Sequence, residues 1–290
     1  MIKGLGTALI TPFDANGNVD YEALARLLDT QLTGSVDYIV VLGTTGEAAT
    51  MTEKEREDVR TFIRKYVNGR LPLVLGVGGN CTAAVCESLR TMDLTGFEAI
   101  LSVCPYYNKP NQEGLYQHFC KIAEASPVPV ILYNVPGRTG VNLLPETVIR
   151  IWKAYPDKII GIKEASGNIA QIKDLITLAN SQFTIHNSQL PFLVISGDDG
   201  IACEIMEAGG AGLISVASNA FPEDFRHIVH DKDRALQAKY EEMVRLLFAE
   251  GNPVGIKAVL AQKGIIQNYL RLPLVPASEE LKGKIKGLVD

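Results

Sequence analysis

Eight short apolar segments recur along the chain, and they constrain its fold more than any other feature. They are rich in valine and isoleucine and alternate little between apolar and polar residues, which is typical of parallel strands covered on both faces. The segments are Leu5–Ile10, Tyr38–Leu42, Leu73–Val77, Ala99–Val103, Val128–Tyr133, Ile159–Ile162, Phe192–Ile195 and Gly212–Val216. Longer amphipathic stretches separate them, so the pattern predicts alternating strands and helices.

The stretches between these segments have helical periodicity. They are Tyr21–Leu32, Thr52–Tyr66, Thr82–Leu94, Gly114–Ala125, Leu144–Ala154 and Ile169–Asn180. The second begins with Thr52-Glu53-Lys54-Glu55, the sequence of a capping box. Eight strand–helix units in 290 residues predict an α/β fold of the (β/α)8 TIM barrel type. A doubly wound open sheet is the alternative, but no glycine-rich fingerprint follows the first strand.

The apolar segments stop after about Pro222, whereas helical patterns continue over residues 231–249 and 254–264. We therefore predict two regions with no linker between them. Residues 1–222 would form the barrel, and residues 223–290 would form a C-terminal helical extension.

Composition excludes several classes of function. The net charge is −5 and no basic run occurs, which disfavours a nucleic acid as partner. No stretch approaches 18 apolar residues and the first residues lack the pattern of a signal peptide, so we expect no membrane partner and a cytoplasmic location. The five cysteines are odd in number and form no Cys-x-x-Cys pair, so we expect buried thiols rather than disulfides or zinc ligands.

Barrel enzymes carry their chemistry at the carboxyl ends of the strands. The residues that follow the predicted strands are polar and aromatic and include no histidine, which disfavours a histidine-based triad or a metal site built from several imidazoles. One lysine, Lys163, is embedded in strand sequence after Ile159–Ile162. Burial of an amine favours its neutral, nucleophilic form, which can attack a ketone and form an iminium. From this segment alone, an internal ion pair with Glu164 or an aspartate is an equal alternative.

Three further features are candidates, each with a structural alternative. The loop Gly43–Glu47 offers amides and two hydroxyls to an anion, or it is an ordinary turn. Tyr133 and Tyr107 could relay protons, or they are amphipathic side chains at a rim or interface. Arg138 could hold a carboxylate with two hydrogen bonds, or it is a solvated loop charge.

Together these segments resemble the dihydrodipicolinate synthase family, which belongs to the pyruvate-dependent class I aldolases and lyases. The resemblance extends over nearly the whole chain. The motifs Gly43–Glu47, Tyr133–Pro136 and Gly161–Glu164 mark the superfamily, while residues 106–110 and 137–140 indicate the synthase branch. The resemblance implies condensation of pyruvate with L-aspartate 4-semialdehyde in lysine biosynthesis through diaminopimelate. It implies no metal and no organic cofactor.

The resemblance also implies a role for each matching residue. The implied catalytic residues are Lys163 as the Schiff-base lysine, Tyr133 as the central proton carrier, and Thr44 and Tyr107 as its relay partners, with Tyr107 from a neighbouring subunit. The implied binding residues are Thr45 for the carboxylate of pyruvate, Arg138 for that of the semialdehyde, and Gly197 and Ile214 for the pocket wall. We expect a homotetramer, arranged as a dimer of dimers.

Two other functions are alternatives to this synthase activity. One is a pyruvate aldolase of the same superfamily that acts on a sugar acid, which the Gly137–Gly140 loop disfavours. The other is a non-catalytic pyruvate sensor, which the complete set of reactive residues disfavours. The segment 182–191 is about nine residues longer than is usual in the family; we expect a surface loop, or an additional strand fragment at Phe183–Ile185.

We predict that lysine inhibits this protein weakly or not at all. Asn80 and Tyr106 match the effector site of lysine-inhibited relatives, but Ala84 stands where these have a carboxylate. Arg56 and Ala48 depart from the same pattern. Without the carboxylate, the ammonium group of lysine lacks its natural partner. A steady-state assay with added lysine measures this directly, and strong inhibition at micromolar lysine would contradict the prediction.

Overall fold

The computed structural model describes residues 2–186 and 191–289. Eight strands in chain order form a closed barrel, which confirms the predicted (β/α)8 fold. The strands are β1 (Gly4–Ala8), β2 (Tyr38–Val41), β3 (Leu73–Gly76), β4 (Ala99–Val103), β5 (Val130–Asn134), β6 (Ile159–Glu164), β7 (Leu193–Ser196) and β8 (Gly212–Ser215). Each coincides with a predicted segment to within two residues at either end.

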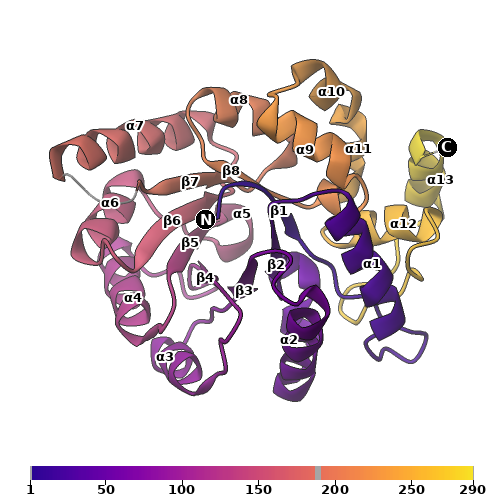
Figure 1. The fold of residues 1–290 in the computed structure, drawn as a ribbon, viewed down its shortest axis with the longest axis horizontal. Coiled ribbons are helices and arrows are strands. Elements are labelled where there is room, and N and C mark those ends of the chain that lie inside the picture. Colours follow the sequence, from indigo (N-terminus) through magenta and orange to yellow (C-terminus); the bar gives the residue numbers. More distant parts are fainter. Residues whose placement is uncertain (1, 187–190, 290) are drawn as a thin grey trace. The chain divides into compact units, whose positions relative to one another are not determined.

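By its internal contacts the chain divides into two compact units, Met1–Leu73 with Ile214–Asp290, and Val74–Leu213. In the second unit β4 to β7 pair in parallel. Figure 1 shows the longer helices of this unit on the outer side of these strands. The helices are α3 (Thr82–Thr91), α4 (Gln112–Ala125), α6 (Pro145–Ala154) and α7 (Ile169–His186), with two short helices, α5 (Pro136–Thr139) and α8 (Ala202–Glu207).

The first unit contains β1, β2 and the C-terminal helices. Its helices are α1 (Tyr21–Thr33), α2 (Glu53–Val67), α9 (Pro222–His230), α10 (Arg234–Lys239), α11 (Glu241–Phe248), α12 (Val254–Gln262) and α13 (Glu279–Val289). Short 3-10 turns are η1 (Thr44–Gly46), η2 (Ala48–Thr50), η3 (Asp199–Ile201) and η4 (Ala217–Asn219), of which η3 lies in the second unit. Helix α9 packs against β1. The domain boundary at residue 222 stays a prediction.

Three expectations from the sequence need correction. The predicted strand fragment at Phe183–Ile185 is wrong, because α7 continues through these residues to His186. The rest of the longer segment, residues 187–190, lies outside the described residues. The helix predicted over 231–249 is divided at Tyr240 into α10 and α11. Finally, Cys81 is exposed, whereas Cys86, Cys104, Cys120 and Cys203 are buried as expected. Within the described ranges, no helix is long and apolar enough to cross a membrane.

The capping box predicted from the sequence begins α2, and it gives a test of local stability. The Thr52 hydroxyl accepts from the Glu55 amide at 3.2 Å, and the Glu55 carboxylate accepts from the Thr52 amide at 2.8 Å. We expect Thr52→Ala to lower the free energy of unfolding by about 1 kcal/mol. The corresponding decrease in Tm is roughly 2–4 °C for a chain of this size.

Thermal unfolding followed by circular dichroism measures this change. Thr52→Ser is the matched control, because it keeps the capping oxygen, and it should unfold near the wild-type Tm. An unchanged Tm in Thr52→Ala would show that the cap contributes nothing.

Candidate active site

Lys163 and Tyr133 lie side by side near the carboxyl ends of β6 and β5. The parallel register pairs Tyr133 with Lys163 directly, and residues opposite each other on neighbouring strands project to the same face. The Lys163 Nζ atom is 4.6 Å from the centroid of the Tyr133 ring. Both side chains are buried, each with 6% of its surface exposed. The structure therefore brings the predicted nucleophile and the predicted proton carrier into contact.

The ion pair considered as an alternative for Lys163 is not formed. Neighbouring residues on a strand project to opposite faces, so Lys163 and Glu164 point apart. Lys163 makes no ion pair and no side-chain hydrogen bond with any residue that the structure describes. A buried amine without a carboxylate partner is free to act as a base or nucleophile.

The Glu164 carboxylate is fully buried, and uncharged donors surround it instead. The Asn134 side-chain amide donates to both oxygens at 3.2 and 3.0 Å. The Ser166 backbone amide donates at 2.8 Å, and the Gln171 side chain donates at 3.2 Å. Asn142 bridges Asn134 and Gln171 and closes the network. These hydrogen bonds satisfy the buried charge without a cation, which leaves Lys163 unpaired.

Gly197 follows β7 and packs against the stem of Lys163. A Cβ atom at this position would lie 2.8 Å from Lys163 Cε and 2.7 Å from Ala165 Cβ. The Gly197 amide donates to the Glu164 carbonyl at 2.8 Å, which fixes the backbone beside the lysine. The close approach explains why glycine occupies this position, and it places the predicted residue beside the candidate nucleophile.

Tyr107 does not join this cluster within the single chain. Its side chain is 90% exposed, and its backbone is left-handed with φ 72°. A ring exposed to this degree cannot be packed against the buried Tyr133. The Tyr107 amide donates to the Thr139 carbonyl at 3.3 Å, so its loop is anchored to the segment that contains Arg138.

Arg138 lies in the short helix α5, whereas its neighbouring residues in the sequence had suggested a loop. The side chain is exposed and makes no hydrogen bond or ion pair with the described residues. Its guanidinium group therefore remains available to a ligand, while the Thr139 hydroxyl beside it donates to the Val135 and Val141 carbonyls. Both the binding role and the solvated alternative fit this exposure.

Thr44 and Thr45 belong to the first unit, in the 3-10 turn directly after β2. Thr44 is exposed, whereas Thr45 has only 3% of its surface exposed. The Thr45 hydroxyl accepts a hydrogen bond of 2.9 Å from the side chain of Asn252. The Thr11 hydroxyl donates to the Gly46 carbonyl at 2.7 Å, so the loop is held from two directions.

A buried ion pair between Lys257 and Glu47 fixes the end of this loop. Both side chains are almost fully buried, and Glu47 has a left-handed backbone with φ 53°. Burial lowers the pKa of Lys257 to about 8, an effect that the Glu47 charge opposes. Lys257 also donates to the Tyr269 carbonyl at 3.0 Å. The Arg271 amide donates to Glu47 at 3.3 Å, so both oxygens of the carboxylate are engaged.

Sequence reasoning missed the residues that support the predicted ones. Lys257 has the same signal as Lys163, a lysine within an apolar run, Val254–Leu260, and could have been found. Asn142, Gln171 and Asn252 lie in segments without any local signal. Ile214 was predicted as a wall residue, and it lies fully buried in β8.

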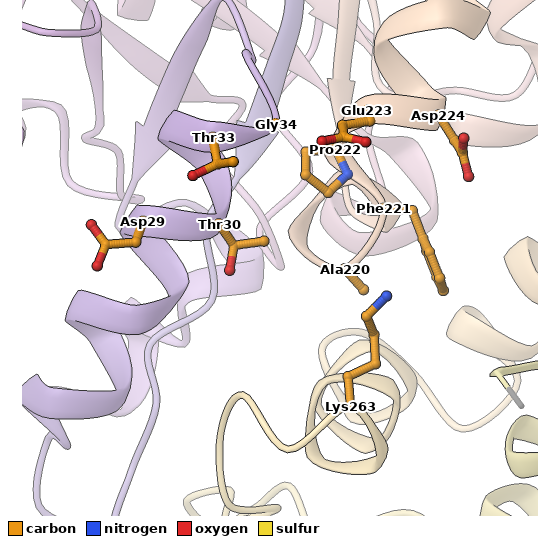
Figure 2. A pocket seen from close by; sticks show the side chains of 10 residues that line it. All are labelled: Asp29, Thr30, Thr33, Gly34, Ala220, Phe221, Pro222, Glu223, Asp224 and Lys263. Atoms are coloured by element: carbon orange, nitrogen blue, oxygen red, sulfur yellow. The ribbon is translucent and has the colours of Figure 1, made fainter.

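A pocket of about 490 Å³ in the first unit contains none of the predicted site residues. Figure 2 shows Lys263 reaching toward Phe221 there, and the Lys263 Nζ atom lies 4.5 Å from the centroid of that ring. Asp224, also on its wall, accepts a hydrogen bond from the Tyr240 hydroxyl. The pocket is therefore a separate feature, and the candidate active site remains at Lys163.

Fold and site define a class of protein: a (β/α)8 barrel whose candidate nucleophile is a buried amine on β6. The chain belongs to the dihydrodipicolinate synthetase family, whose sequence profile matches residues 1–290. The resemblance inferred from the motifs is thereby confirmed.

Individual relatives agree with this assignment. The 4-hydroxy-tetrahydrodipicolinate synthase of Parabacteroides distasonis is 50% identical over 282 residues, which cover 95% of this chain and 92% of the relative. The crystal structure of dihydrodipicolinate synthase from Thermotoga maritima has a TM-score of 0.93 at 40% identity and covers 100% of this chain and 98% of its own. The chloride-inhibited dihydrodipicolinate synthase of Acinetobacter baumannii, solved with pyruvate, has a TM-score of 0.91 at 37% identity, with coverage of 100% and 98%.

Substitution of Gly197 tests the packing around the lysine. In Gly197→Ala the new methyl group would displace the Lys163 side chain, because the contact of 2.8 Å with Cε is too short. We expect kcat/KM for the condensation assay of the family to fall by about tenfold or more, since small misplacements of reacting groups cost rate steeply.

Gly283→Ala in α13 is the control, because a methyl group at that position would meet no atom within 4 Å beyond its chain neighbours and the nearby backbone of its own helix. It should retain wild-type kinetics. If Gly197→Ala also retains them, the lysine does not depend on this close contact.

Proposed function

We propose that this protein condenses pyruvate with L-aspartate 4-semialdehyde through a Schiff base on Lys163. The observation that supports this most strongly is a buried lysine that lacks a carboxylate partner and lies against Tyr133. Membership of the family and the names of its relatives support the choice of substrates. The pyruvate complex of the Acinetobacter baumannii enzyme supports pyruvate as the first of them.

In the proposed reaction, the neutral Lys163 amine attacks the keto carbon of pyruvate, and loss of water gives an iminium. The iminium withdraws electrons, so a proton leaves the methyl carbon and an enamine forms. The enamine carbon then attacks the aldehyde carbon of the semialdehyde, whose oxygen takes up a proton and becomes a hydroxyl group. The amine of the second substrate next attacks the iminium carbon, closes the ring and displaces Lys163, which regains its amine.

Each of these steps moves a proton, and we propose that Tyr133 carries it. Its ring contact with Lys163 supports this role, because the phenol belongs to the strand beside the nucleophile. Thr44 and Tyr107 would link Tyr133 to solvent as relay partners. The exposure of Tyr107 in the single chain supports its contribution to a neighbouring subunit rather than to its own.

We propose that the substrate carboxylates have separate binding sites. The Thr45 hydroxyl would bind that of pyruvate, with Gly197 and Ile214 as parts of the pocket wall. Arg138 would bind that of the semialdehyde, and its unpaired guanidinium group supports this role. A sugar acid as second substrate remains the alternative, and the assay below distinguishes the two.

A shared Tyr107 requires at least a dimer, and we propose a homotetramer built as a dimer of dimers. The exposed Tyr106 and Tyr107 side chains support an interface at this loop, since large aromatic side chains favour burial between subunits. We further propose a cytoplasmic location, which the predominantly buried cysteines support.

Reduction with borohydride in the presence of pyruvate tests the proposed intermediate. We expect a stable adduct on the peptide that contains Lys163, observed as a mass increase, and we expect none in Lys163→Arg. Arginine keeps the charge but cannot form the neutral nucleophile.

Addition of aspartate semialdehyde before the borohydride should decrease the amount of adduct, since turnover releases the lysine. Addition of sugar aldehydes should leave that amount unchanged. Labelling at another lysine, or none at all, would rule out the proposed mechanism. Release by a sugar aldehyde alone would favour the alternative substrate.

A further inference from the structure

Asn252 is buried, yet its side chain has one hydrogen-bond partner among the described residues. Its Nδ2 atom donates to the Thr45 hydroxyl at 2.9 Å, while its Oδ1 atom is buried without a partner there. Burial of an amide with part of its hydrogen-bonding capacity unused costs stability, and an apolar side chain of similar size would avoid this cost. A residue that is unfavourable for stability suggests a role in function.

The direction of this hydrogen bond decides what the Thr45 hydroxyl can do. A hydroxyl group has one hydrogen and two lone pairs. Because Asn252 donates, Thr45 accepts, and its own hydrogen stays unused among the described residues. The hydroxyl is thereby prepared to donate to an anion. Were the partner an acceptor such as a carboxylate, the hydrogen of Thr45 would be taken up by it.

The contact is held in place by the rest of the same segment. Asn252 lies two residues before the start of α12, and Lys257 lies on that helix and pairs with Glu47. The segment therefore contacts the Gly43–Glu47 loop at both Thr45 and Glu47. Lys257 and Arg271 also lie over the Phe13 ring, at 4.2 and 4.4 Å from its centroid. Two contacts, one from Asn252 just before α12 and one from Lys257 on it, fix the loop relative to this segment.

We infer that Asn252 is a positioning residue that orients the Thr45 hydroxyl as a hydrogen-bond donor to the carboxylate of the keto acid. The inference rests on the proposed function, in which Thr45 binds pyruvate. Asn252 would act through Thr45 without touching the reacting atoms. Its loss should therefore raise the pyruvate concentration needed for half-saturation more than it lowers the maximal rate.

A double-mutant cycle between Asn252 and Thr45 tests the inference. The measured quantity is the pyruvate concentration that gives half-maximal borohydride trapping on Lys163, together with kcat at saturating pyruvate. Asn252→Leu should raise that concentration about tenfold, the effect of weakening one hydrogen bond to a charged group. Thr45→Val should raise it at least as much. In the double variant, Asn252→Leu should cause no further increase over Thr45→Val alone, since the hydroxyl that Asn252 orients is already absent.

Two further variants distinguish a loss of Thr45 orientation from a general loss of protein stability. Asn268→Leu is the matched control, because Asn268 also has a buried Oδ1 atom without a partner among the described residues, and its pyruvate dependence should be unchanged. If Asn252→Leu does not fold, Asn252→Asp has the same shape and accepts where the amide donates. It should also raise the half-saturating concentration, by more than tenfold, because it takes up the hydroxyl hydrogen and adds a negative charge.

The outcomes distinguish this inference from the proposed function. If the wild type forms no adduct on Lys163, the proposed function fails. If the wild type forms it, but a folded Asn252 variant has an unchanged pyruvate dependence, only the role of Asn252 fails. Equal effects of Asn252→Leu with and without the Thr45 hydroxyl would also overturn the role, because they would show that the two side chains act independently.

Discussion

The opposite orientation of Lys163 and Glu164 on β6 is the constraint on which the site depends. Adjacent residues of a strand project to opposite faces, and here one face receives an amine and the other a carboxylate. Coulombic attraction would otherwise pair them, and a paired ammonium group would be a poor nucleophile. The separation works because the amide groups of Asn134 and Gln171 satisfy the carboxylate without adding charge. The barrel geometry thus keeps a buried amine and a buried carboxyl group on neighbouring residues apart.

The chain contains a second buried lysine that shows the other outcome. Lys257 also lies within an apolar run, but it projects from a helix and meets Glu47 directly. Desolvation penalises both charges, and their attraction offsets part of that cost. Such a pair therefore holds the loop in place and does not supply a reactive amine. Of the two alternatives weighed for Lys163 from its sequence, the ion pair is found at Lys257 instead, and the nucleophile role of Lys163 stays a proposal. The local pattern alone cannot distinguish them, because the partner comes from elsewhere in the chain.

This difference explains how far the sequence predicts the structure. The strands and the capping box follow from neighbouring residues, since burial on both faces and the cap at Thr52 are local properties. The break at Tyr240 and the continuation of α7 to His186 were missed, because no helix-breaking residue marks the first and the apolar residues of Phe183–Ile185 are compatible with a strand or a helix. Thr45 and Asn252 are 207 residues apart, and their contact has no signature in either segment. The candidate catalytic side chains were predicted from their residue types and motifs, whereas the residues that hold them could be identified only from the fold.

The conformation of Tyr107 indicates that its partner comes from outside the single chain. Its left-handed backbone costs about 1 kcal/mol or more for a residue with a side chain, and its exposed ring gains little packing in return. The anchoring of its amide to Thr139 shows that the conformation is held and is not a consequence of a loose loop. A constrained, exposed aromatic side chain is explained if an adjoining subunit buries it. The proposed relay through Tyr107 and the proposed assembly then have a common physical cause, because the contact that buries the ring would also deliver its hydroxyl to a neighbouring site.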